Sequence, residues 1–167
     1  MFQNKTPKFM NFTKLNSQKK KLLISNLEID YGFNTSFLNN YIFYITSKNK
    51  VLISKVDIDK IKLDRINSIG IYFGVYHDEI RFRLSLEGSK FIKPTKNYIK
   101  INKEIMKSYV AAENLFLEEV EMINCDKISP FKIVVFENDN LGCVSHRNKE
   151  LLTYMPKSRK LDYNKVF

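Results

Sequence analysis

The residues best placed to do chemistry lie in "SIGIYFGVYHDEIRFRL", residues 68–84, which reads as a strand, a turn and a returning strand. Its two glycines, Gly70 and Gly74, lack the spacing of a phosphate-binding loop. Glycine inside a strand pattern more often marks a bulge or a close approach of two backbones. Arg81 and Arg83 fall on one face of the returning strand, where they either contact RNA or a protein partner or form a solvated edge.

Both histidines lack a partner that would complete a catalytic pair. His77 lies in a turn beside two acids, and no nucleophile stands at a recognisable spacing from it. Ser145 and His146 are neighbours on an expected strand, so their side chains point to opposite faces. The acids within residues 118–121 lack the oxygen-rich loop of a calcium site and are expected on a solvated face. We therefore expect no enzyme, no metal site and no cofactor.

The charge of the chain points to a polyanionic partner. The 167 residues carry a net charge of +10, and 44% of them are hydrophobic, which allows a packed core. The cations gather at the two ends: residues 1–27 hold six lysines and no acid, and residues 143–167 hold six cations against two acids. This asymmetry favours binding to nucleic acid or to an anionic membrane surface, although lysine-rich codon usage would also raise the charge.

Cysteine usage and apolar runs indicate an intracellular protein that does not enter a membrane. Cys125 and Cys143 lack the spacing of zinc ligands, and two cysteines do not make a secreted disulfide scaffold. The longest apolar run, "YIFYI", is far shorter than a membrane span. No apolar stretch follows the amino terminus, so we expect no secretory signal.

The hydrophobic pattern predicts an α+β fold in two parts. The segment "KPT", residues 93–95, is the best linker, because proline restricts both itself and the residue before it. It divides the chain into residues 1–92, of which 1–12 are expected to form a flexible tail, and residues 93–167. In the first part we expect helices over 13–26, 48–56 and 85–91, and strands over 32–38, 41–46, 66–76 and 80–84.

The second part is predicted to be a small unit rich in β-structure with one helix near its start. Asn102 is the expected cap of that helix. The segment 115–123 is ambiguous between helix and strand, and its pattern slightly favours a strand. The other expected strands cover residues 98–101, 131–137, 141–147 and 162–167.

With these two parts laid out, the sequence resembles a known family. Several segments recur, in the same order, in the Nip-seven type proteins: "IFYITSK", "INSIGIYFGVYHDEIRFRL", "YIKINKEIMKSYV", "FKIVVFENDNLG" and "SRKLD". The resemblance runs from about residue 41 to residue 162. The chain departs from the family at "YVAA", residues 109–112, which lacks the glycine that lets the backbone turn close to RNA. Val144 replaces a second family glycine.

The resemblance implies both a fold and a function. The fold is an amino-terminal α/β pre-PUA-like domain followed by a small PUA-like RNA-binding β-barrel. The function is that of a non-catalytic assembly factor for the large ribosomal subunit, acting in the processing of pre-ribosomal RNA. Its implied partners are ribosomal RNA or its precursor, and assembly factors or ribosomal proteins, with no membrane. Such a protein is expected in the nucleus or nucleolus and also in the cytoplasm, as a monomer outside the particle.

A late basic segment provides the expected RNA contacts. Its cations suit phosphate binding, and Tyr154, which lies among them, is expected to stack on an exposed base. The cations are Arg147, Lys149, Lys157, Arg159 and Lys160.

Two other functions remain open at this point. The protein could stay on mature ribosomes in a structural or regulatory role, because contacts with ribosomal RNA have the same chemistry there. It could also be an accessory RNA-binding subunit of an RNA-modifying enzyme, or a nuclease subunit. In that case its only candidate acids and bases are His77, His146 and the acids of residues 118–121.

Overall fold

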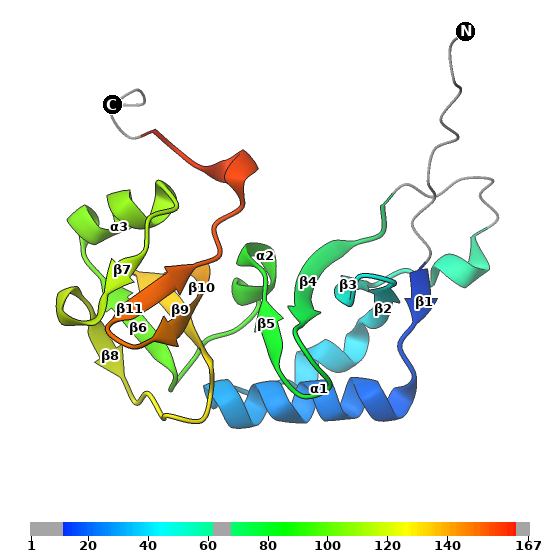
Figure 1. Cartoon of the computed structure of the whole chain (residues 1–167). Helices are drawn as coiled ribbons and strands as arrows, with labels where there is room; N and C mark the ends of the chain where they lie inside the picture. The colour runs from blue at the N-terminus through cyan, green and yellow to red at the C-terminus, as the bar shows by residue number, and fades with distance from the viewer. Residues whose placement is uncertain (1–11, 62–67, 163–167) are drawn as a thin grey trace, which may run out of the picture.

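The computed structural model describes residues 12–61 and 68–162 of the chain. It is a mixed α+β fold with two sheets and few helices, as the hydrophobic pattern predicted (Figure 1). The strands of the first sheet are β1 (Phe12–Lys14), β2 (Ile42–Thr46), β3 (Lys50–Ser54), β4 (Ile71–Tyr76) and β5 (Phe82–Leu84). They lie in this order, and each pairs antiparallel with the next.

Helix α1 (Ser17–Tyr31) lies along the first sheet, and its carboxyl end reaches the second part of the chain (Figure 1). The predicted helix over 13–26 began too early. The side chain of Asn16 caps the helix by accepting a hydrogen bond from the Lys19 backbone N–H (2.8 Å), and Thr13 lies in β1 instead. Residue 12, expected in a flexible tail, is also part of β1. No described helix is long and apolar enough to cross a membrane.

Two expectations in the first part are wrong. The predicted strand over 32–38 is mostly irregular and ends in the short 3-10 helix η1 (Ser36–Asn40). The predicted helix over 48–56 is mostly strand β3, followed by the 3-10 turn η2 (Ile58–Lys60). Strand β3 is the central strand of the sheet, and Val51, Leu52 and Ile53 are all buried, so both of its faces are covered. A short apolar run of this kind cannot be told from a helix by its periodicity.

The glycine-bearing hairpin forms as expected. In the pairing of β3 with β4, Val51 lies opposite Gly74 and Leu52 opposite Tyr72, so Phe73 is the extra residue of a bulge. At Gly70, with a φ of 50°, an added Cβ would meet the carbonyl oxygen of Ile53. The one-turn helix α2 (Leu86–Ser89) follows β5, within the predicted range 85–91. Residues 66 and 67, the predicted start of the long strand, lie outside the described residues.

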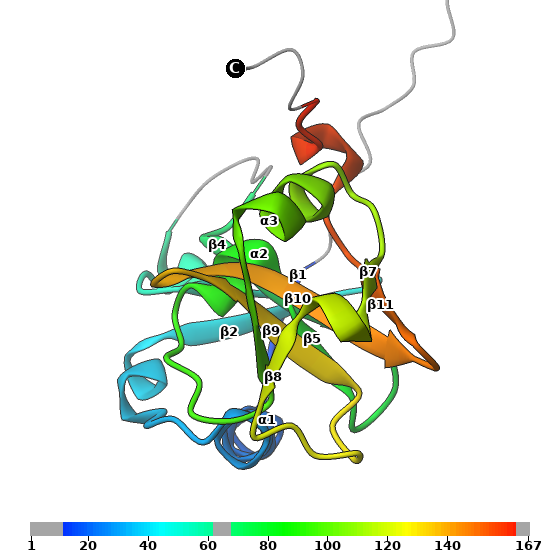
Figure 2. The ribbon, with the colours of Figure 1, turned by 90° about the vertical axis from the view of Figure 1, so that its left-hand side faces the viewer.

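The second sheet has strand order β7-β11-β10-β9-β6-β8 and is curled rather than flat (Figure 2). Among the strands of the described residues, only β6 and β9 pair in parallel. The bounds are β6 (Tyr98–Ile101), β7 (Leu115–Phe116), β8 (Glu121–Ile123), β9 (Phe131–Phe136), β10 (Asp139–Arg147) and β11 (Glu150–Thr153). The remaining elements are α3 (Lys103–Val110), η3 (Leu117–Glu119) and η4 (Lys157–Arg159).

Most expectations for the second part are confirmed. Strand β6 has the predicted bounds, and the Asn102 side chain caps α3 by accepting a hydrogen bond from the Ile105 backbone N–H (2.9 Å). The ambiguous segment 115–123 contains two short strands with a 3-10 turn between them. The final strand predicted over 162–167 lies outside the described residues except for Asp162, which is not in a strand.

One buried cluster joins the two sheets. It contains side chains of α1 and of strands β2 to β5, together with Ile133 and Val135 from β9 and Cys143 from β10. The break between the sheets lies close to the boundary predicted after residue 92. The division of the chain into two domains stays a prediction, and the shared buried cluster couples the two sheets closely.

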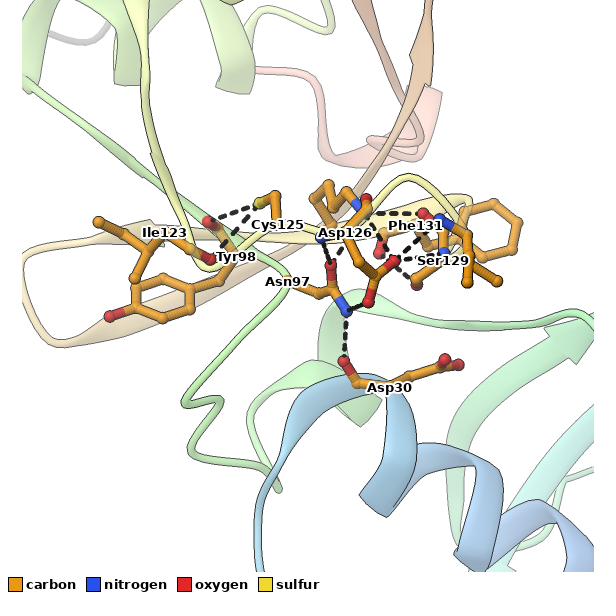
Figure 3. A network of polar contacts seen from close by, with 10 residues as sticks. Asp30, Asn97, Tyr98, Ile123, Cys125, Asp126, Ser129 and Phe131 are labelled. Carbon is orange, nitrogen blue, oxygen red and sulfur yellow. Dashed lines mark hydrogen bonds and ion pairs between the residues drawn. The ribbon is translucent and has the colours of Figure 1, made fainter.

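A buried polar network also ties α1 to the second sheet (Figure 3). The Asn97 side-chain N–H groups donate to the backbone carbonyl of Asp30 (2.6 Å) and to the carboxylate of Asp126 (2.7 Å). Lys132, only 1% exposed, donates from its ammonium to Asn97 Oδ1 (2.9 Å) and to the backbone carbonyls of Asp126 (2.8 Å) and Ser129 (2.7 Å). Every proton of this buried ammonium group therefore has an acceptor.

Candidate nucleic-acid interface

Two predicted contact residues from different halves of the chain lie together. The guanidinium carbon of Arg83 is 4.0 Å from the centre of the Tyr154 ring, well within the range of a cation–π interaction. The Tyr154 hydroxyl donates a hydrogen bond to the hydroxyl oxygen of Ser145 on β10 (3.0 Å). Arg83 therefore covers one face of the ring, and Tyr154 can offer a base at most its other face.

His77 and Phe131 complete this group. The Arg83 Nε–H donates to His77 Nε2 (3.2 Å), which requires a neutral imidazole with its proton on Nδ1. The His77 ring centre lies 5.1 Å from that of Phe131 and 6.1 Å from that of Tyr154. We call His77, Arg83, Phe131, Ser145 and Tyr154 the seam cluster, because it joins the β4–β5 hairpin to the second sheet.

Strand geometry positions the seam cluster. Successive side chains of β5 alternate, so the buried Phe82 and Leu84 place Arg83 on the opposite face. Strand β11 pairs antiparallel with β10, with Ser145 opposite Leu152, and the Tyr154 side chain that follows the strand reaches diagonally back to Ser145. Arg83 therefore comes from the first sheet, whereas Ser145 comes from the second and Tyr154 directly follows its strand β11.

The other predicted cations fall into two groups, one at each end of β11. Arg147 and Lys149 are exposed at the β10–β11 turn, which we call the turn group. Lys157, Arg159 and Lys160 are exposed in and after η4, which we call the tail group (red in Figure 1). Strand β11, four residues and about 13 Å long, lies between the two groups, and Tyr154 follows it. The predicted cations are therefore not one compact patch.

Arg159 is not free. Its Nη2 forms an ion pair with Glu87 Oε1 of α2, in the first half of the chain. Two residues later, the Leu161 backbone N–H donates to the carbonyl of Val110 at the end of α3 (2.9 Å). Lys160 lines an open hollow of about 450 Å³ beside α3. The tail segment is thus held against both halves.

Arg81 and Arg83 differ in a way that their spacing did not indicate. Arg81 is exposed and its Nε pairs with the carboxylate of Asp78 in the hairpin turn. Backbone hydrogen bonds from Arg81 and Ile80, together with the Arg81 side chain, hold the pKa of Asp78 at about 2. Arg83 is half-buried and has no salt bridge to any carboxylate of the described residues.

The neutral state of His77 is testable. Partial burial lowers the pKa of His77 below its ordinary value of 6.5, and the charges of Arg83 and Arg81 lower it further, against a smaller opposing effect of Asp78. An NMR titration should show this lowered pKa, and Arg83→Gln should raise it, because one positive neighbour is removed. His146 gives the only other histidine signal. Since protonation of His77 opposes folding, its contribution to stability is complete above pH 6.5 and falls below it.

Sequence reasoning missed three members of the seam cluster. His77 was considered only as a catalytic base, Ser145 only as a nucleophile, and Phe131 only as part of a buried strand. No local sequence signal could have shown that these residues lie together. The contact that brings the two halves of the cluster together is between Arg83 and Tyr154, which are 71 residues apart in the sequence.

A comparison of the chain with models of known protein families finds no match, and neither does a comparison with curated proteins. The resemblance to the Nip-seven type proteins therefore rests on the sequence segments quoted above.

Proposed function

We propose that the protein is a non-catalytic RNA-binding assembly factor of the large ribosomal subunit, acting in pre-ribosomal RNA processing together with partner assembly proteins. The observation that carries the proposal is the seam cluster with cations on both sides of it. An aromatic ring beside a guanidinium, flanked by exposed lysines, is a composition that suits single-stranded RNA. In this proposal the first sheet with α1 is the pre-PUA-like domain, and the curled second sheet is the PUA-like domain.

The flanking cations have charge available for a polyanion. Arg147, Lys149, Lys157 and Lys160 are exposed, and none of them forms a salt bridge within residues 12–61 and 68–162. When these side chains neutralise RNA phosphates, they displace the counterions condensed on the RNA, and the entropy of ion release favours binding. Tyr154, the only aromatic side chain of residues 147–160, would then make the contacts with RNA bases.

Salt dependence of RNA binding tests the proposal. With four to six phosphates contacted, the logarithm of the affinity for a labelled single-stranded RNA should fall against the logarithm of salt concentration with a slope of about −3 to −4. The double variant Lys157→Gln/Lys160→Gln should reduce the size of that slope by about 1 to 2. The matched control Lys21→Gln/Lys48→Gln removes the same charge from the first half and should leave the slope unchanged. A flat salt response of the wild-type protein would contradict the proposal.

Glu87 is expected to weaken RNA binding, because it competes with phosphate for Arg159. Replacing Glu87 with Gln should tighten RNA binding about two- to five-fold, the range expected for a partly exposed ion pair. Glu28→Gln is the control, since it removes one negative charge from an exposed position on α1. The gain should disappear in Glu87→Gln/Arg159→Gln. An equal gain in both single variants would instead indicate a general effect of net charge.

Sedimentation of cell extracts separates assembly from retention on mature ribosomes. Migration with precursors of the large subunit supports the proposal, and migration with finished ribosomes supports the structural or regulatory alternative.

A further inference from the structure

We propose that Arg83 binds a backbone phosphate of the RNA, so that both halves of the protein hold one strand across the seam cluster. The inference rests on the proposed function and adds to it a phosphate site in the first half, which the late basic segment does not contain.

The first argument is the unused hydrogen-bonding capacity of Arg83. A guanidinium has five N–H donors, and only Nε–H of Arg83 is engaged, by His77. Among the described residues, no buried side-chain nitrogen or oxygen lacks a partner. The Nη1 and Nη2 groups of Arg83 therefore reach the solvent. They form a fork of parallel donors that matches two oxygens of a phosphate.

The second argument is that this fork is already held in place. The Tyr154 ring lies against the guanidinium at 4.0 Å, and His77 Nε2 fixes its Nε edge. Tyr154 is itself fixed by its hydrogen bond to Ser145. Binding of a ligand therefore costs little conformational entropy of the Arg83 side chain. Partial burial also weakens the screening of the Arg83 charge by salt and water.

The third argument favours RNA over an acidic protein segment. The turn group and the tail group place exposed cations before and after Tyr154, at opposite ends of β11. A chain of evenly spaced phosphates can satisfy both groups and the Arg83 fork together, whereas a single carboxylate would use only the fork. The open face of the Tyr154 ring would then accept a base next to the bound phosphate.

The experiment compares two arginines that lie two residues apart. RNA affinity is measured against salt concentration for wild-type protein, Arg83→Gln, Arg83→Lys and the matched control Arg81→Gln, with a labelled single-stranded RNA. Arg83→Gln should weaken binding about ten-fold and reduce the size of the salt slope by about 1. Arg83→Lys keeps the charge but loses the fork, so it should weaken binding several-fold with an unchanged slope. Arg81→Gln should change affinity less than about two-fold, because the Arg81 side chain is paired with Asp78.

The outcomes separate the inference from the proposed function. Equal effects of Arg83→Gln and Arg81→Gln, with wild-type RNA binding intact, would overturn the Arg83 site and leave the proposed function standing. Absence of salt-dependent RNA binding in the wild-type protein would overturn both. Unchanged RNA binding with loss of a protein partner would show that the fork binds a carboxylate of that partner. If Arg83→Gln does not fold, Arg83→Lys decides: wild-type affinity in this variant would overturn the inference.

Discussion

Replacing Lys132 with methionine is expected to lower the free energy of unfolding by about 2 to 5 kcal/mol, because each buried acceptor that loses its donor costs about 1 to 3 kcal/mol. The ammonium of Lys132 is nearly inaccessible to solvent and donates to Asn97 Oδ1 and to two backbone carbonyls. Methionine has nearly the same length but no donor, so the backbone carbonyls of Asp126 and Ser129 would lose their partner, whereas Asn97 Oδ1 would keep the hydrogen bond from the Asp126 backbone N–H. The loss should be measured by urea denaturation.

The control for this prediction is Lys127→Met, in the loop that precedes β9. Lys127 is exposed, and its replacement should change the free energy of unfolding by less than about 0.5 kcal/mol. Similar stability of the two variants would show that the network around Lys132 adds little. In that case the fold tolerates the buried charge of Lys132, but this charge does not help to hold α1 against the second sheet.

Replacing Gly88 with alanine is expected to cost about 3 kcal/mol or more, at the upper end of the range for overpacking. Gly88 lies in α2, where an added Cβ would collide with the carbonyl group of Phe73 on β4. The helix cannot easily move away. The Ser85 hydroxyl donates to the Tyr72 carbonyl (2.5 Å), and the Ser85 backbone N–H donates to the Phe73 carbonyl (2.9 Å), which fix the start of α2 on the strand.

Thermal unfolding of Gly88→Ala and of Lys90→Ala provides the comparison. Lys90 follows α2 directly and is exposed, so its replacement should leave the melting temperature nearly unchanged. A Gly88→Ala variant as stable as the wild-type protein would show that α2 can shift along β4. The position of Glu87, and with it the ion pair to Arg159, would then be less fixed than the structure indicates.

Local signals predicted the elements whose evidence lies within a few residues. The alternating "YIKI" gives β6, and Asn102 caps the helix that follows. The two glycines of the hairpin indicated a bulge or a close approach of two backbones, and both occur: a bulge at Phe73 beside Gly74, and a close approach of Gly70 to the Ile53 backbone. The same reasoning failed for β3. A strand that is buried on both faces lacks the alternation of apolar and polar residues by which a strand is recognised.

The candidate site could be predicted only as separate residues. Arg83 and Tyr154 were each recognised, but their contact depends on how the β4–β5 hairpin meets the end of β11. The pairing of Arg159 with Glu87 has the same origin, since it joins η4 to α2. Sequence spacing carries no information about such long-range contacts, and it gave Arg81 and Arg83 the same role although only Arg81 is paired with an acid.

The buried cluster shared by the two sheets has a consequence for synthesis of the protein. Because Ile133, Val135 and Cys143 belong to it, a growing chain that has not yet left the ribosome as far as β10 cannot cover α1 and the first sheet. The apolar surface that these three side chains cover would stay accessible during translation and offer a binding site for chaperones. Fragments that end near residue 92 should therefore aggregate, and mutational studies are better carried out on the full-length protein.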